Sequence, residues 1–208
     1  MFVLVGAVLI VSASGLSSAP QVAPSADALV AELGQFRAAL PAMAPSTGVP
    51  SPMEVRRAAV YDELWTLGPA AVPALARGLS NADVQIRRNV ALFLNAAGGD
   101  WYKIERPRLD IRGCLPALTE ALSDADARVR ALAAQALGTI GPEASAAVPA
   151  LIVLLGSSDE GSRNSACIGL AGIGPLAREA LPALRRALDD SSRDVRGFAQ
   201  RAIDRINR

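Results

Sequence analysis

Four copies of a short proline-containing motif recur along the chain, and this repetition constrains the fold more than any other feature. The pentapeptides AVPAL, CLPAL, AVPAL and ALPAL place their prolines at positions 73, 116, 149 and 182, so successive prolines are 43, 33 and 33 residues apart. An arginine follows each proline by fourteen residues: Arg87, Arg130, Arg163 and Arg196. Landmarks that coincide in four copies predict a protein built from internal repeats.

Each unit predicts two helices joined by a short polar turn. The first helix carries the repeated proline in its first turn, where the missing N–H of proline is least costly. The second helix has a capping side chain ten residues after the proline, and its apolar residues recur at the 3.6-residue period of a helix. Because a unit of about 33 residues cannot bury its own apolar face, neighbouring units must stack on one another. We therefore expect an all-α fold, a right-handed α-solenoid of stacked two-helix units.

The boundaries of the units follow from the same count. Residues 53–69 match a second helix with one extra residue and form a partial unit, which residues 26–40 could complete as a divergent N-terminal unit. Four full units follow at 70–99, 113–141, 142–174 and 175–208. Ten extra residues break the period and form an inserted loop at 99–113. The preceding region, residues 20–52, is rich in Pro, Ala and Ser and contains an amphipathic stretch that predicts a helix at 26–40. Its apolar side chains fall on one helical face: Leu29, Leu33, Phe36 and Leu40.

The first residues of the chain resemble a targeting segment. Residues 1–19 contain the apolar run FVLVGAVLIV followed by small residues, which is typical of a signal peptide and too short to span a bilayer. The basic residues that normally precede such a run are missing, since the first basic residue is Arg37. We expect an exported protein, periplasmic or associated with the cell envelope, or one held by an N-terminal anchor. The alternative is a buried apolar arm in a cytoplasmic protein.

The chain lacks the side chains on which most enzymes and metal sites depend. It has 208 residues, no histidine and two cysteines, Cys114 and Cys167, each at a position that other units fill mainly with alanine. Without histidine, the commonest general base and metal ligand is absent. The 21 basic and 20 acidic residues leave a net charge of +1, which gives no overall attraction to nucleic acid or anionic membranes. We predict no catalytic residue, no cofactor, no metal site and no nucleic-acid partner.

Two-helix units with this proline and with an Asp…Val-Arg pattern opening the second helix resemble HEAT repeats. They are most similar to the short bacterial HEAT-like repeats named after phycobilisome lyases. The resemblance covers residues 53–208 and is clearest in SDADARVRALAAQALGTIGP and LDDSSRDVRGFAQRAIDRI. It implies a structural ladder in which Asp124 and Asp190 pair with arginines of the repeated column. That column comprises Arg87, Arg130, Arg163 and Arg196, and Asn81 and Ser157 replace the aspartate in units one and three.

The resemblance implies a non-enzymatic scaffold for protein–protein interaction, with an unidentified protein or peptide as its partner. The alternative that it implies is a bilin-lyase-like factor, or another enzyme or chaperone-like factor acting on a tetrapyrrole or a modified protein. One protein with HEAT-like repeats is a hydroxylase that binds iron through histidine and glutamate. Because this chain has no histidine, that activity is not expected here.

Two surfaces are candidates for binding the partner. The first is the concave face of the second helices, at 15, 18, 19 and 22 residues after each proline, where only three of sixteen residues are charged. Its candidate contacts are Arg88, Leu92, Gln135, Ile168 and Arg201. The second surface is the inserted loop, whose candidates are Trp101, Tyr102, Arg106 and Arg108. A loop that folds back on the solenoid, and a reactive rather than a packing thiol at Cys167, are the alternatives.

Overall fold

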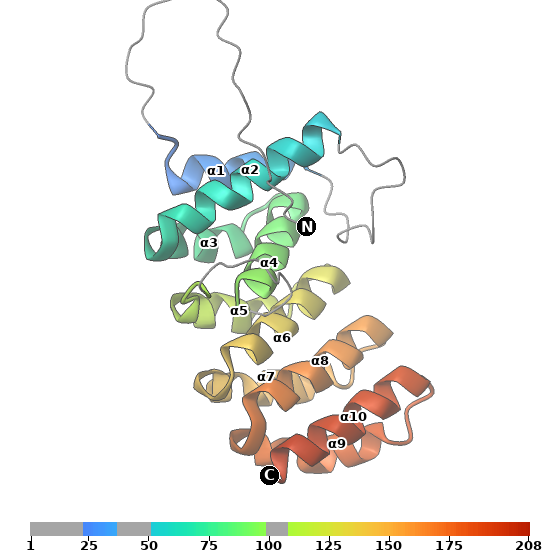
Figure 1. Ribbon diagram of the computed structural model, residues 1–208. Helices are drawn as coiled ribbons and strands as arrows, with labels where there is room; N and C mark the ends of the chain where they lie inside the picture. The colour runs from blue at the N-terminus through green and yellow to red at the C-terminus, as the bar shows by residue number, and fades with distance from the viewer. Residues whose placement is uncertain (1–22, 37–50, 99–107) are drawn as a thin grey trace, which may run out of the picture.

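The chain is a stack of helix pairs. The computed structural model describes residues 23–36, 51–98 and 108–208, and within these ranges every regular element is a helix (Figure 1). The repeats contain α3 (Val72–Leu79), α4 (Val84–Gly98), α5 (Leu115–Ala121), α6 (Ala127–Ile140), α7 (Val148–Leu154), α8 (Glu160–Ile173), α9 (Leu181–Ala187) and α10 (Arg193–Ile206). The second helices of the units pack on one another in chain order, α4 on α6, α6 on α8 and α8 on α10. The predicted all-helical solenoid is therefore confirmed.

The repeated prolines mark the start of every first helix. Each is the second residue of its helix, and a short 3-10 segment leads into it. These segments are η2 (Gly68–Ala71), η3 (Arg112–Cys114), η4 (Pro142–Ala147) and η5 (Gly174–Ala180). At this position the amide that proline lacks would have had no partner within the helix, so the residue fixes where the helix begins without weakening it.

Capping side chains and glycines delimit the second helices. Asp126 accepts a hydrogen bond from the Val129 amide at 3.1 Å, and Asp159 accepts one from the Ser162 amide at 2.7 Å. Gly141 and Gly174 follow α6 and α8 with φ angles of 87° and 70°, a left-handed conformation that glycine adopts without steric cost. Local chemistry therefore fixes both ends of these helices.

The buried faces form one continuous core along the stack. In α6, Val129, Ala133 and Leu137 are fully buried, at 13, 17 and 21 residues after the proline of their unit. Ile140 of α6 and Ile203 of α10, at 24 and 21 residues after their prolines, are only partly buried, whereas Ile206 at the end of α10 is fully buried. Because the core runs from unit to unit without a break, each unit depends on its neighbours for stability.

The N-terminal segment is shorter as a helix than the sequence predicts. It consists of α1 (Ala26–Glu32) and η1 (Leu33–Gln35), after which Phe36 is extended. The buried Asn89 of α4 explains this ending, because its Nδ2 donates to the carbonyl oxygens of Leu33 at 2.9 Å and of Phe36 at 2.8 Å. The side chains of Leu29, Leu33 and Phe36 are nevertheless buried. Leu40 lies outside the described residues.

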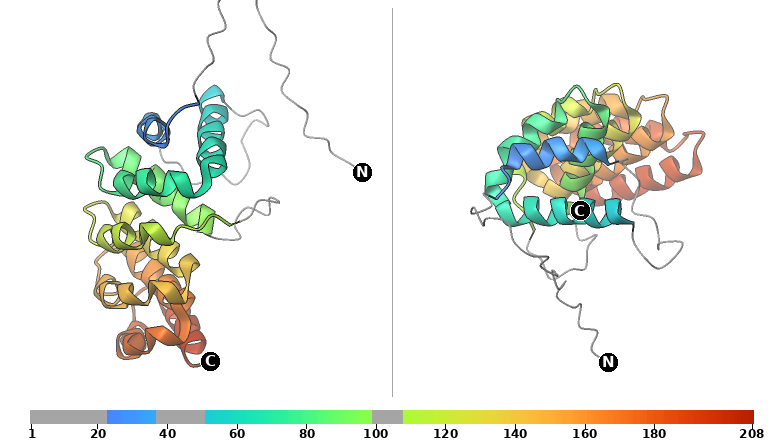
Figure 2. Two further views of the ribbon diagram at one scale, coloured as in Figure 1. Left: turned by 90° about the vertical axis from the view of Figure 1, so that its left-hand side faces the viewer. Right: turned by 90° about the horizontal axis from the view of Figure 1, so that it is seen from above.

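Helix α2 (Pro52–Leu67) completes the layer above the first unit (Figures 1 and 2). Tyr61 and Trp65 meet the ring of Phe93 in α4 edge-on, with centroids 5.3 Å and 6.0 Å apart. Arg56 binds Glu32 of the N-terminal segment at 2.6 Å. Aromatic packing and an ion pair therefore join α1, α2 and α4 into one end of the stack.

Two predicted features lie outside the described residues. They are the signal-like segment 1–19 and the part of the insert that carries Trp101, Tyr102 and Arg106. Among the helices that are described, none is long and apolar enough to cross a membrane.

Candidate functional site

The repeated arginine column holds the turns and joins neighbouring units. In each unit the arginine Nη1 donates to two carbonyl oxygens of its own turn, such as Ser157 and Ser158 for Arg163, at 2.9 Å and 3.1 Å. Arg163 also makes a two-point ion pair with Asp190 of the next unit, at 2.8 Å and 3.0 Å. Hydrogen bonding to Arg163 lowers the pKa of Asp190. These arginines are used within the scaffold.

The same pairing joins units one and two but is missing between units two and three. Arg87 binds Asp124 with nitrogen–oxygen distances of 2.7 Å and 3.1 Å. At the next boundary Ser157 occupies the place of the aspartate, and the Nε of Arg130 reaches only the hydroxyl of Ser162, at 3.4 Å. The boundary between units two and three therefore needs another source of cohesion.

Glycines bring α6 and α8 into direct backbone contact at that boundary. A Cβ atom added at Gly169 would lie 2.6 Å from the carbonyl oxygen of Ala134, and one added at Gly172 would overlap the backbone of Gly138. Any larger residue would therefore push the two helices apart. Because these glycines carry no side chain, the surface beside them forms a depression between the larger side chains on either side.

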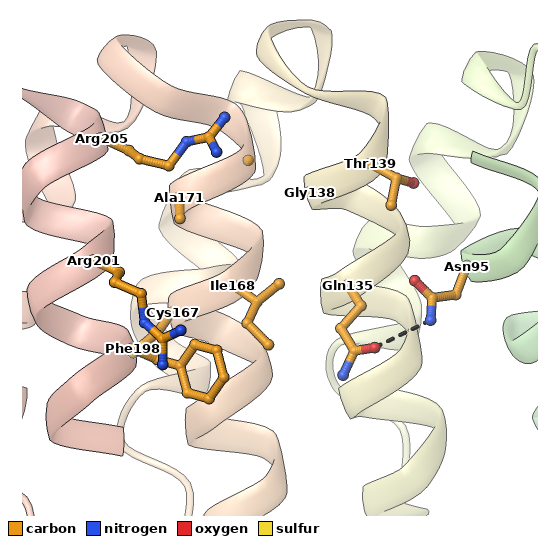
Figure 3. A pocket seen from close by; sticks show the side chains of 11 residues that line it. Asn95, Gln135, Gly138, Thr139, Cys167, Ile168, Ala171, Phe198, Arg201 and Arg205 are labelled. Carbon is orange, nitrogen blue, oxygen red and sulfur yellow. Dashed lines mark hydrogen bonds between the residues drawn. The ribbon is translucent and has the colours of Figure 1, made fainter. Parts of the chain in front are cut away.

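A groove of about 620 Å3 lies on this surface and crosses the second helices from α4 to α10 (Figure 3). We call it the second-helix groove. Its lining residues are Asn95, Gln135, Gly138, Thr139, Cys167, Ile168, Ala171, Gly172, Phe198, Arg201 and Arg205. Its volume falls within the range typical of sites that bind small molecules, roughly 300–1,000 Å3.

One end of the groove presents uncharged amides. Asn95 of α4 donates through Nδ2 to Gln135 Oε1 at 3.1 Å (Figure 3), and Gln135 donates through Nε2 to the Ser165 hydroxyl at 2.9 Å. Asn95 is only 8% exposed, and its Oδ1 is buried without a hydrogen-bond partner. This end therefore contains a buried acceptor whose hydrogen bond no described group supplies.

The middle of the groove is formed by small and apolar side chains. Ile168 is partly exposed there, between the glycines of α6 and α8 and the ring of Phe198. Cys167 lies beneath the surface with no exposed area, and burial raises the pKa of its thiol to about 12. The thiol is therefore protonated at neutral pH and is not a reactive nucleophile in the folded chain.

The other end of the groove is positively charged. Arg201 and Arg205 lie one turn apart on α10 and are both exposed. The guanidinium of Arg201 lies 4.1 Å from the ring centroid of Phe198, and its Nε donates to the Gly197 carbonyl at 3.3 Å. The groove therefore changes from neutral amides through an apolar middle to two cationic groups.

The structure distributes the predicted contact residues unevenly. Gln135, Ile168 and Arg201 line the groove, whereas Leu92 packs against the core and Arg88 pairs with Asp126 at 2.5 Å. Hydrogen bonding to Arg88 lowers the pKa of Asp126, which also caps α6, so Arg88 serves the scaffold. Arg108 is exposed and does not line the groove.

The exposed face of the second helices is rotated from the one that the repeat positions predict. Positions eighteen residues after the prolines were expected on it, but Ala91, Ala134 and Cys167 are fully buried. The prediction missed Thr139, Gly172 and Arg205 at twenty-three residues after the proline, and Phe198 at sixteen. Thr139, Gly172 and Arg205 each lie four residues after Gln135, Ile168 and Arg201, and this (i, i+4) relation could have identified them.

The described residues hold neither a cluster of metal ligands nor a thiol with a lowered pKa. No group of three or more His, Cys, Asp or Glu side chains is arranged to hold a metal ion among residues 23–36, 51–98 and 108–208. Burial raises the pKa of the Cys114 thiol to about 11, so neither cysteine is activated.

Comparison with known proteins gives the same fold. The sequence profile of HEAT repeats matches residues 115–204. A comparison with curated proteins found no match. A solved structure of computationally designed armadillo repeat proteins for modular peptide recognition is 24% identical, with a TM-score of 0.58, and the match covers 72% of this chain and 69% of that one.

Two further structures are similar over more of the chain. The complex of CpcE and CpcF of phycocyanin lyase from Nostoc sp. is 23% identical over 94% of this chain and 70% of that one, with a TM-score of 0.57. A designed armadillo repeat protein in complex with the peptide (KR)4 is 20% identical over 87% and 81%, with a TM-score of 0.60. Residues 115–204 of this chain are similar to HEAT repeats, and its described part has the repeat-solenoid fold of these structures.

Proposed function

We propose that the chain is a non-enzymatic scaffold that holds an extended segment of a partner protein in the second-helix groove. The observation that carries the proposal is the groove itself, which places an unpaired amide acceptor, Asn95 Oδ1, beside an apolar middle and two arginines. Leaving such an acceptor unsatisfied costs roughly 1–3 kcal/mol. A backbone N–H of a bound peptide can supply the missing hydrogen bond.

The nature of the groove favours a polypeptide over other ligands. A peptide in extended conformation offers N–H groups and side chains at alternating positions, and the groove offers an acceptor and an apolar surface side by side. Structures with the same fold support the idea, since the designed armadillo proteins named above are described as built for peptide recognition or as bound to a peptide. The inserted loop, with Trp101 and Tyr102, remains a second predicted contact area.

The test is a selection of random octapeptides on the full-length chain, followed by affinity measurements on two variants. Ile168→Arg places a long charged side chain in the groove. Val153→Arg makes the same change at a residue of α7 that is 77% exposed and does not line the groove. We expect selected peptides to bind wild type and Val153→Arg equally and to lose at least tenfold in affinity for Ile168→Arg. Binding that survives in Ile168→Arg would contradict the proposal.

A tetrapyrrole-related function is the alternative, and its support is the likeness to the phycocyanin lyase complex. A factor of that kind would carry or transfer a pigment. The absorption spectrum and intact mass of protein purified from the native cell separate the two functions. A stoichiometric pigment that Ile168→Arg removes would replace the peptide proposal. Export, with removal of residues 1–19, is a separate proposal that the same intact mass tests.

A further inference from the structure

The charges in the second-helix groove all have one sign. Arg201 and Arg205 are the charged side chains among its lining residues, and no carboxylate of the described chain lines it. The two arginines are four residues apart on α10, so their guanidinium groups project from neighbouring turns on the same side of the helix (Figure 3). Like charges at this spacing repel each other, and a bound anion would relieve the repulsion.

Neither arginine is neutralised by another described residue. Arg201 contacts the Phe198 ring and the Gly197 carbonyl, and no described carboxylate forms an ion pair with Arg201 or Arg205. Asp204 adjoins Arg205 in sequence, but its Oδ1 accepts a hydrogen bond from Gln200 at 2.8 Å. The arginines of the repeated column, by contrast, are all bound to turn carbonyls. The groove therefore holds two neighbouring cationic groups that form no ion pair with a described residue.

We infer that the preferred occupant of the groove is an acidic peptide with alternating apolar residues, whose carboxylates bind Arg201 and Arg205. This inference rests on the proposed function and specifies the partner. Apolar side chains of such a peptide would lie on Ile168 and Phe198, and a backbone N–H would reach Asn95 Oδ1. A basic peptide, of the kind bound by the similar designed armadillo protein, would be repelled by the two arginines.

The size of the groove sets the length of a suitable probe. Neighbouring helices in a packed layer lie roughly 8–10 Å apart, so the three steps from α4 to α10 extend over roughly 25–30 Å. An extended chain advances about 3.3 Å per residue, so about eight residues reach from the amides to the arginines. Labelled octapeptides of sequence (Asp-Leu)4, (Asn-Leu)4 and (Lys-Leu)4 differ in charge and keep the same apolar pattern.

The experiment measures the affinity of these three probes for the full-length chain by fluorescence anisotropy. We expect (Asp-Leu)4 to bind about tenfold more tightly than (Asn-Leu)4, with (Lys-Leu)4 the weakest. The double variant Arg201→Gln/Arg205→Gln should abolish the advantage of (Asp-Leu)4. Arg185→Gln/Arg186→Gln, which removes two exposed charges of α9 away from the groove, should preserve it. Added salt should reduce the affinity for (Asp-Leu)4 most.

The possible failures are distinct. If (Asn-Leu)4 and (Asp-Leu)4 bind equally and both are lost in Ile168→Arg, the groove binds peptides without selecting acidic ones, and this inference is overturned while the proposed function stands. Failure of (Asp-Leu)4 to bind also overturns it, and if the octapeptide selection likewise yields no ligand, the proposed function is contradicted too. A labelled dT8 oligonucleotide that binds more tightly than (Asp-Leu)4, and depends on the same two arginines, would overturn the assignment of a peptide.

Discussion

Units three and four are joined in a different way from units two and three. The boundary between units three and four has a largely buried ion pair, Arg163 with Asp190, whose side chains are 14% and 12% exposed. The boundary between units two and three has a serine in place of the aspartate and relies on backbone contact between α6 and α8 through glycines. One repeat sequence can therefore join neighbouring units by charge or by close packing. The boundary that depends on glycine is also the one beneath the groove.

The largest effect is expected from Gly172→Ala, which attacks the close-packed boundary. The new methyl group would overlap the backbone of Gly138, and backbone cannot rotate away as a side chain can. We expect the free energy of unfolding to fall by about 1–3 kcal/mol in denaturant titrations. Gly197→Ala is the control, because its Cβ would meet only the end of the Arg201 side chain at 3.8 Å and should preserve or raise stability. A Gly172→Ala protein as stable as wild type would show that the glycine contact is dispensable.

Asp190→Asn tests the charged boundary. It leaves the largely buried guanidinium of Arg163 without its anion, and loss of a charge-assisted hydrogen bond costs about 1–3 kcal/mol. The introduced side-chain amide would still be able to accept the hydrogen bond that the Ser192 backbone N–H donates to Asp190. Asp189→Asn removes the same charge from the exposed neighbouring residue and should change the melting temperature little. Equal losses in the two variants would mean that the ion pair adds nothing beyond net charge.

The pH dependence of stability sharpens the same test. The pKa of Asp190 is lowered in the folded chain by hydrogen bonding to Arg163, so folding favours its ionised form. Its contribution is complete above the unfolded pKa of about 3.9 and is lost as pH falls through the lowered folded value. We expect the stability difference between wild type and Asp190→Asn, measured in urea, to be large at pH 7 and to shrink below about pH 4. A constant difference would be inconsistent with the ion pair as its source.

Ser157→Asp should give the boundary between units two and three an ion pair like the one between units three and four. The aspartate would face Arg130 as Asp190 faces Arg163, and its carboxylate would replace the hydroxyl that now accepts from the Asp159 amide at 3.2 Å. We expect a gain of about 0.2–1 kcal/mol, because the new pair is partly exposed. The gain should vanish in an Arg130→Gln background, and Ser158→Asp, one residue away, should not produce it.

The smallest expected effect is a local one, a change in the rate at which the two buried cysteines react with a thiol reagent. Both thiols are fully buried, with pKa values raised to about 11 and about 12, so a thiol reagent should modify the native chain only as it opens. In Gly172→Ala we expect Cys167, which lies beside the loosened boundary, to react sooner than Cys114, as mass spectrometry of the labelled peptides would reveal. Unchanged order and rate would place the loosening elsewhere.

Sequence reasoning identified local features more reliably than the exposed surface. The prolines at the second position of the first helices and the capping residues Asp126 and Asp159 were predictable, because each acts on residues three or fewer positions away. The end of α1 was predicted too late, because the residue that terminates it, Asn89, is more than fifty positions distant. The insert with Trp101 lies outside the described residues, so its role stays a prediction.

The candidate site also combines features that the sequence predicts with features that depend on distant residues. Three of the predicted contacts, Gln135, Ile168 and Arg201, line the groove, whereas Leu92 at the same repeat position packs against the core. Arg88 was expected beside them and instead binds a neighbouring unit through Asp126. Whether a polar side chain faces a ligand or another unit depends on partners that repeat positions alone do not reveal.

The amino-acid sequence by itself determined that the chain is a stack of helical pairs, because the signals for that outcome are local and appear four times. Only the tertiary structure decided which residues form the groove. The approach of α6 to α8 through Gly138, Gly169 and Gly172 sets the rotation of the second helices, and with it which side chains are buried between them and which remain open to a partner. That rotation is a property of packing between units, which no single unit encodes.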